Sequence, residues 1–188
     1  MMRYEHPLII YELDGVLADC AVREAAAEPA GPRRGKGSLA YWKTLFDSHH
    51  LKQDLLVDKG RDLTHQLWKD NVHQIVLTRR PIGLTRGGPF DESYYATMAW
   101  CLEQGLMPGW FQAWIFRAQR SRPEAVWKQE QIYLYMGEHS EVDHLYVVDK
   151  NKENRYAIGF LCHDLHLDMD LLPDIRALEA ILERDRKS

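Results

Sequence analysis

Short apolar runs alternate with longer amphipathic segments along this chain of 188 residues. The apolar runs cover residues 8–11, 73–78, 113–116 and 145–148, with a weaker one at 157–161. Runs of this length, rich in β-branched and aromatic residues, are typical of buried strands. Because parallel strands need crossover connections of a dozen or more residues, this spacing predicts an α/β fold with a doubly wound parallel sheet.

The segments between these runs predict helices. Residues 25–38 predict a loop, and residues 39–71 predict mainly helix with a break near Lys59 and Gly60. Further helices are expected from Asp91 to Gly105, from Pro123 to Gly137, and after Pro173, where Ile175, Leu178 and Leu182 recur at helical spacing. Residues 20–71 therefore form either a small helical cap or a crossover insert.

Length and composition predict one domain, residues 1–188, of 22.0 kDa. A formal net charge of -4 leaves no bulk attraction to nucleic acid or anionic membranes, so any polyanion site must be a local one. Apolar stretches of bilayer length and a secretory apolar region are both missing, which predicts a cytoplasmic protein with no membrane partner. Cys20, Cys101 and Cys162 are widely spaced, as expected of reduced, buried thiols, and the oligomeric state stays open.

Two carboxylates, Glu12 and Asp14, come one residue apart directly after the first apolar run, and Gly15 follows them. Alternate residues of an extended chain share a face, so both carboxylates can hold a hard cation such as Mg²⁺. One of them can then attack phosphorus while the other moves a proton. Taken alone, the segment is equally consistent with a solvated Asp-Gly turn.

The segment Glu12-Leu13-Asp14-Gly15-Val16-Leu17-Ala18-Asp19 resembles the first motif of the haloacid dehalogenase-like (HAD) phosphatases, Asp-x-Asp-Gly-Thr/Val-Leu-x-Asp. Three later segments are similar to the remaining motifs, in the order in which the family has them. They are Leu77-Thr78-Arg79-Arg80-Pro81, Val126-Trp127-Lys128-Gln129 and Val147-Val148-Asp149-Lys150. The resemblance spans residues 8–162, and each motif falls at a predicted strand end or helix start.

This resemblance implies a HAD-like fold with at most a small cap and a site that handles phosphate. Glu12 stands at the nucleophile position and Asp14 at the acid and base position. Thr78 would hold the phosphoryl group, and Lys128 would neutralise its charge. The metal ligands for Mg²⁺ would be Glu12, Asp14 and Asp149.

Within the family, the pattern is nearest to the phosphatase domain of polynucleotide kinase-phosphatases, through scattered apolar, aromatic and Arg positions up to and including Arg117. That likeness implies that Arg117 binds substrate phosphate, and that the ligand is a phosphorylated small molecule or a nucleic-acid end. Arg79 adds a guanidinium fork beside the phosphate, where it can bind substrate phosphate or crowd the loop. Arg33, Arg34 and Lys36 lie on the predicted loop and can contact such phosphates, or they form a merely solvated surface. Trp42 can likewise stack a base or belong to the core.

Three positions depart from the family pattern. Glu12 replaces the nucleophilic aspartate, Lys150 replaces a second metal-binding carboxylate, and Arg79 replaces a glycine. A misplacement of about 1 Å can cost roughly 10²-fold in rate, and Lys150 should weaken Mg²⁺ binding. If Lys150 points into the site, it should pair with Glu12 or Asp149.

These departures favour a phosphate-ester-recognising protein with weak or absent phosphatase activity. The alternative is an active Mg²⁺-dependent phosphomonoester hydrolase, of the nucleotidase or polynucleotide 3′-phosphatase type, that uses Glu12 and Asp14.

Overall fold

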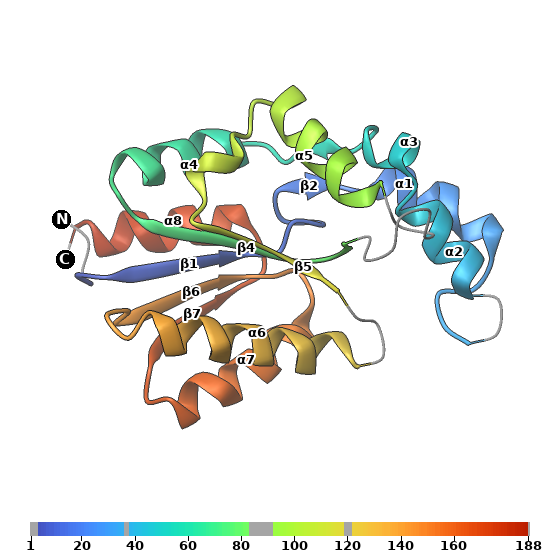
Figure 1. The fold of residues 1–188 in the computed structure, drawn as a ribbon. Coiled ribbons are helices and arrows are strands. Elements are labelled where there is room, and N and C mark those ends of the chain that lie inside the picture. The colour runs from blue at the N-terminus through green and yellow to red at the C-terminus, as the bar shows by residue number, and fades with distance from the viewer. Residues whose placement is uncertain (1–3, 36–37, 83–91, 119–121, 188) are drawn as a thin grey trace.

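Five parallel strands form the central sheet of the computed structural model, which describes residues 4–35, 38–82, 92–118 and 122–187 (Figure 1). The strands are β1 (Pro7–Tyr11), β4 (His73–Pro81), β5 (Ala113–Arg117), β6 (His144–Val148) and β7 (Asp168–Leu172), in the spatial order β5-β4-β1-β6-β7. The strand β1 pairs in parallel with both β4 and β6, which confirms the predicted doubly wound α/β sheet. In such sheets ligands bind where the strand order reverses, at the carboxyl end of the central strands.

Helices cover both faces of this sheet (Figure 1). One face carries α4 (Gly60–Lys69), α5 (Ser93–Glu103) and α8 (Ile175–Asp185), and the other carries α6 (Glu124–Glu138) and α7 (Lys152–Asp164). Side chains of β1 alternate between the two cores, with Ile9 and Tyr11 in the first and Leu8 and Ile10 in the second. A strand buried on both faces explains why the run is apolar throughout.

A helical insert, residues 18–56, leaves the sheet after β1 and lies beyond the carboxyl ends of the strands (Figure 1). It begins and ends with the antiparallel pair β2 (Ala18–Asp19) and β3 (Leu55–Leu56), and contains α1 (Ala21–Ala27), η1 (Glu28–Ala30), α2 (Ser38–Leu45) and α3 (Ser48–Leu51). Its own small core, which includes Tyr41, Leu45 and Phe46, packs against Ala96 of α5. The helix α4 belongs instead to the sheet.

The structure corrects two local predictions. The weak apolar run 157–161 is helical, because Asn154, Ile158 and Cys162 are buried along one side of α7 at a spacing of four residues. The fifth strand is β7, at the edge of the sheet, where Asp168 and Asp170 obscured the strand pattern.

In the predicted loop 25–38, residues 25–27 continue α1 and residues 28–30 form η1. A short 3-10 turn, η2 (Pro108–Trp110), precedes β5. The expected helix start at Asp91 and the cation Lys36 lie outside the described residues. Among the helices that the structure describes, none has the length and apolarity needed to span a bilayer.

Candidate active site

Four of the predicted site residues meet at the carboxyl end of the central strands. Glu12 follows β1, Thr78 lies in β4, Asp149 follows β6, and Lys128 projects from α6. All four are buried, with at most 4 % of any one exposed. The motifs are far apart in the sequence, and the parallel sheet brings them to one place.

The Glu12 carboxylate is surrounded by hydrogen-bond donors. Its Oε1 accepts from the Leu13 amide at 2.9 Å, the Asp14 amide at 3.3 Å and the Thr78 hydroxyl at 2.9 Å. Its Oε2 accepts from the Lys128 ammonium. Burial raises the pKa of Glu12, and Lys128 offsets only part of that effect. The donors that surround this carboxylate form a cradle for an anion.

The Lys128 ammonium lies among three carboxylates. Besides Glu12, it contacts Asp149 Oδ2 at 2.5 Å and Glu124 Oε1 at 3.4 Å. Burial alone would lower the pKa of Lys128, but the three acids raise it. Asn154 Nδ2 donates to both Asp149 and Glu124, at 2.9 and 2.8 Å, and holds these carboxylates in place.

The same three carboxylates suit a divalent cation. Oxygen atoms of Glu12, Glu124 and Asp149 lie within 4.8 Å of one another, and an all-oxygen set is what Mg²⁺ prefers. Mg²⁺ bound there would compete with the Lys128 ammonium for the same oxygens. Asp14, the third ligand expected from the sequence, is directed elsewhere.

Asp14 belongs to a buried cluster of opposite charges, formed by Asp14, Arg23, Asp54 and Arg80 and called here the arginine–aspartate cluster. Its carboxylate pairs with Arg23, with Arg80 at 2.8 Å, and with the more peripheral Arg79 at 3.4 Å. Burial by itself would raise the pKa of Asp14, but these arginines hold it well below its usual range. An acid so strongly ionised is a poor proton donor or acceptor at neutral pH.

Asp54 completes the cluster from the helical insert. It binds Arg23 Nε at 2.8 Å and Arg80 at 2.6 Å, and the side chains of all three are fully buried. The Trp100 indole donates to the Asp54 carbonyl at 2.7 Å, and Arg80 also donates to Thr97 at 3.2 Å. These contacts attach the insert to β4 and α5.

Lys150 lies at the rim of the site. Its ammonium is 3.9 Å from Glu24 and 3.8 Å from Cys20 Sγ, and 44 % of its side chain is exposed. Its aliphatic part crosses Gly15, which has φ of +81° and where a Cβ would collide with it. Pairing with Glu12 or Asp149 is expected of an inward-pointing Lys150; Lys128 pairs with both instead.

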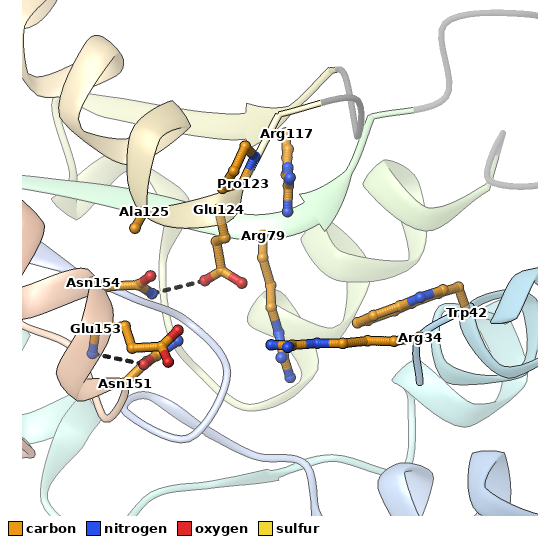
Figure 2. Close-up of a pocket in the computed structure, with 10 residues that line it drawn as sticks. All are labelled: Arg34, Trp42, Arg79, Arg117, Pro123, Glu124, Ala125, Asn151, Glu153 and Asn154. Carbon is orange, nitrogen blue, oxygen red and sulfur yellow. Dashed lines mark hydrogen bonds between the residues drawn. The ribbon is translucent and has the colours of Figure 1, made fainter. Parts of the chain in front are cut away.

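A cavity of about 470 Å³ lies above these groups, between the insert and the sheet domain (Figure 2). Its lining includes Arg34, Arg79, Arg117 and Trp42. Glu124 also lines it and contacts the Lys128 ammonium. The remaining lining residues are Pro123, Ala125, Asn151, Glu153 and Asn154. The cavity thus combines three cationic forks, an indole ring and several amide and carboxylate groups.

Sequence reasoning missed several residues of the site: Arg23, Asp54, Arg80, Glu124 and Asn154. Two of them carried a usable pattern. Arg80 stands within the second motif, and Glu124 precedes Lys128 by one helical turn, the spacing at which helix side chains meet. Arg23 and Asp54 come from the insert, whose packing has no periodic signature in the sequence.

Comparison with solved structures identifies the fold. A hydrolase from Streptococcus pneumoniae TIGR4 has a TM-score of 0.59 at 15% identity, over 97% of this chain and 100% of its own. A Had-superfamily hydrolase from Ehrlichia chaffeensis has a TM-score of 0.56 at 10% identity, over 99% and 97%. A chain of the Pnkp1/Rnl/Hen1 complex has a TM-score of 0.52 at 16% identity, over 89% of this chain and 46% of that one. No family model and no curated protein matches the sequence. The chain has the HAD-like fold that its motifs predicted.

Proposed function

We propose that this protein recognises a phosphate ester, such as a nucleotide or the phosphorylated end of a polynucleotide, with weak or absent phosphatase activity. The observation that carries the proposal is a contrast between two neighbouring parts of the site. The cavity presents guanidinium groups of Arg34, Arg79 and Arg117. The groups that turnover requires are bound to one another beneath it.

The cavity suits a phosphorylated nucleotide. Guanidinium forks bind phosphate oxygens in pairs, and an indole such as that of Trp42 can stack a base. Amide groups of Asn151 and Asn154 lie on the same cavity and can bind sugar hydroxyls. Since Arg34 and Trp42 come from the helical insert, the insert acts as the cap of this site (Figure 2).

The contacts of three side chains support the proposal that phosphatase turnover is weak. Glu12 directs its carboxylate at the donors that a phosphoryl oxygen would need. Asp14 is ionised and paired with arginines, so it is a poor general acid. Lys128 is held between Glu12 and Asp149, where its charge is already balanced. Phosphoryl transfer depends on positioning and charge stabilisation, and all three contacts oppose it.

The alternative, a Mg²⁺-dependent phosphomonoester hydrolase, is favoured by one observation: the converging oxygens of Glu12, Glu124 and Asp149. Bound there, Mg²⁺ would neutralise the developing charge on the phosphoryl group. In that case Glu12 would attack phosphorus, and Asp14 would have to leave its arginine partners to move a proton.

Fluorescence anisotropy tests recognition. A labelled oligonucleotide with a 3′-phosphate should bind more tightly at low salt than the same oligonucleotide with a 3′-hydroxyl. Arg34→Ala, which removes an exposed cation of the cavity, should weaken binding of the phosphorylated form about tenfold. Arg61→Ala is the matched control, because Arg61 is 53 % exposed and pairs with Asp62 on α4. Equal affinity for both oligonucleotides would contradict the proposal.

Phosphate release separates the two functions. The native chain should release little or no phosphate from the 3′-phosphorylated oligonucleotide or from a generic phosphomonoester, with or without Mg²⁺. Rapid Mg²⁺-dependent release that Glu12→Gln abolishes would instead establish the hydrolase.

A further inference from the structure

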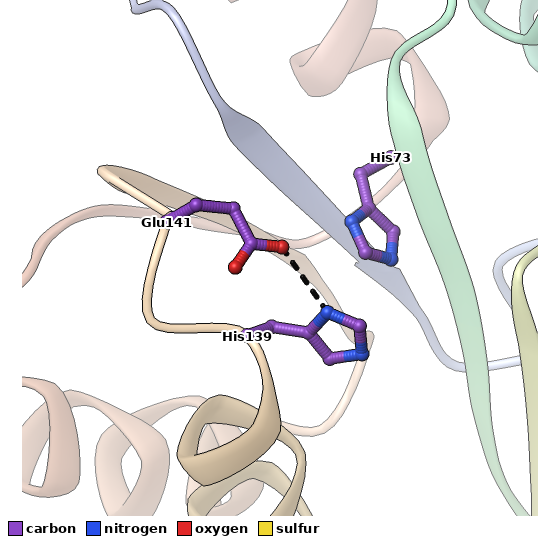
Figure 3. Close-up of side chains that lie close together, drawn as sticks. All are labelled: His73, His139 and Glu141. Atoms are coloured by element: carbon purple, nitrogen blue, oxygen red, sulfur yellow. Dashed lines mark hydrogen bonds and ion pairs between the residues drawn. The ribbon is translucent and has the colours of Figure 1, made fainter.

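The side chains of His73, His139 and Glu141, all of types that bind metal ions, lie close together (Figure 3). His73 is the first residue of β4, whereas Thr78 lies further along the same strand. His139 follows the end of α6, and Glu141 lies between α6 and β6. Because the strands are parallel, this cluster and the candidate active site lie at opposite edges of the sheet.

The three side chains converge from two distant segments of the chain. One ligand atom from each of His73, His139 and Glu141 lies within 4.8 Å of the other two. His139 Nδ1 is 3.2 Å from Glu141 Oε1, and the two imidazole rings are 5.0 Å apart at nearly right angles. Three potential ligand atoms from two segments of the chain therefore lie close enough together to share one metal ion.

A fourth residue, Tyr135, holds both imidazole rings. Its hydroxyl is 2.6 Å from His73 Nε2, and its ring stacks on His139 with centroids 4.3 Å apart. Metal-binding histidines are ordinarily oriented by such a hydrogen bond from their second ring nitrogen. Tyr135 therefore restrains the rings near the geometry in which they approach one another.

We propose that His73, His139 and Glu141 bind a divalent transition-metal ion of the Zn²⁺ type. Two imidazoles and one carboxylate form a donor set that suits Zn²⁺, whereas Mg²⁺ and Ca²⁺ prefer oxygen ligands. The His139 side chain is 30 % exposed and that of Glu141 is 52 % exposed, which leaves room for water ligands.

Binding needs only a small closure of the cluster. Tetrahedral donors at the usual zinc distances are about 3.4 Å apart, so donors now within 4.8 Å of one another would approach by at most about 1.4 Å, and His139 Nδ1 and Glu141 Oε1 are already 3.2 Å apart. Glu141 is exposed and lies in a connection, and His139 lies just beyond a helix end, so both can adjust. The ion would link the start of β4 to the segment between α6 and β6.

Titration calorimetry and thermal unfolding with ZnCl₂ test the proposal. The native chain should bind one Zn²⁺ ion at this cluster and unfold at a higher temperature, because the ion binds the folded state. His139→Ala and Glu141→Gln should each lower the affinity by at least about tenfold, and Tyr135→Phe by about tenfold. The matched control is His49→Ala, which removes a histidine of α3 in the insert and should leave Zn²⁺ binding unchanged.

The visible absorption of bound Co²⁺ reports metal coordination directly, so a substitution that only perturbs the fold would not mimic its loss. The Co²⁺-loaded native chain should show visible absorption typical of coordination by imidazole nitrogen, and His139→Ala should lose it. Zn²⁺ affinity unchanged in both His139→Ala and Glu141→Gln, or no binding of Zn²⁺ at millimolar concentration, would overturn the proposal. Because the cluster lies far from the cavity, these outcomes are independent of phosphate-ester recognition.

Discussion

The Glu12 carboxylate itself occupies the anion cradle that the surrounding hydrogen-bond donors form. Two backbone amides, the Thr78 hydroxyl and the Lys128 ammonium donate to this one carboxylate. An aspartate, shorter by one methylene, would not reach as far toward Thr78 and Lys128. Under the proposed function, the side chain at the position that the resemblance assigns to the nucleophile thus also occupies the place of a phosphate oxygen.

Removing this carboxylate should therefore open an anion site. We expect Glu12→Ala to bind inorganic phosphate at least about tenfold more tightly than the native chain, because the freed donors include a charged one. Glu12→Gln is the matched control, since its amide has the same length and still fills the cradle. Phosphate titration by calorimetry measures both variants. Equal phosphate affinity of Glu12→Ala and the native chain would show that the cradle does not accept phosphate.

Position 15 disfavours any residue other than glycine, both because of its backbone conformation and because of the neighbouring Lys150 side chain. Its φ of +81° disfavours other residues, and a Cβ would collide with the Lys150 side chain. Gly15→Ala should lower the free energy of unfolding by more than about 1 kcal/mol. Adding Lys150→Ala should restore the steric part and leave the backbone part, which urea unfolding of both single variants and the double variant measures. If the stability losses of the two single variants simply add in the double variant, the collision with Lys150 does not contribute to the effect of Gly15→Ala.

At the scale of elements, the sequence predicted four of the five strands of the sheet, including the edge strand β5, and missed β7 at the other edge. Residues 8–11 and 145–148 are buried on both faces, so continuous apolar runs marked β1 and β6. The edge strand β7 contains two aspartates, and the apolar stripe of α7 resembled a strand over five residues. Short apolar runs do not distinguish a strand from a buried helix face, and that ambiguity produced the error.

The candidate site was predictable at the motif positions to which the family resemblance assigns a role, at three strand ends and on α6. Glu12, Thr78, Lys128 and Asp149 carried motif patterns, and the structure brings them together. The partners of Asp14 were not predictable, because Arg23 and Asp54 reach it through the fold of the insert. Their catalytic, binding and metal roles stay predictions for the experiments above.

The arginine–aspartate cluster connects the helical insert to the sheet domain, and Asp54 is the link. Asp54→Asn would leave Arg23 and Arg80 buried with half of their countercharge, a loss of about 3–5 kcal/mol. Hydrogen exchange should accelerate in α1 to α3 and little in β1 and β6. Asp58→Asn, an exposed change nearby, should leave exchange unaltered. Uniform acceleration across the sheet would show that the cluster stabilises the whole molecule rather than the attachment of the insert.

For the whole molecule, the distribution of charge bears on phosphate attraction more than the net charge does. The chain carries a formal charge of -4, yet the cavity gathers Arg34, Arg79 and Arg117 at one place. A local field of this kind can attract a phosphate while the rest of the surface repels long polyanions. Under the proposed function, this arrangement would favour a short or terminal phosphate ligand over extended nucleic acid.

The buried charges of the arginine–aspartate cluster make the stability of the protein depend on pH. Burial opposes ionisation of Asp14, but Arg23, Arg80 and Arg79 hold its pKa well below the usual range. A carboxyl group with a depressed pKa in the folded state stabilises the protein above its unfolded pKa of about 4, and this stability is lost as the pH falls through the folded pKa. The free energy of unfolding should therefore fall below pH 4, by up to about 1.4 kcal/mol per pH unit for this one group.

Asp14→Asn isolates this contribution. The variant should be about 3–5 kcal/mol less stable at pH 7, because two buried arginines lose a countercharge. Its stability should also change less steeply between pH 4 and pH 2.5, since the group that takes up the proton is gone. Urea unfolding followed by tryptophan fluorescence at several pH values measures both effects, and Asp58→Asn should retain the native slope. Parallel curves for Asp14→Asn and the native chain would mean that Asp14 does not titrate with folding, and that its pairing with the arginines does not set the acid stability of the protein.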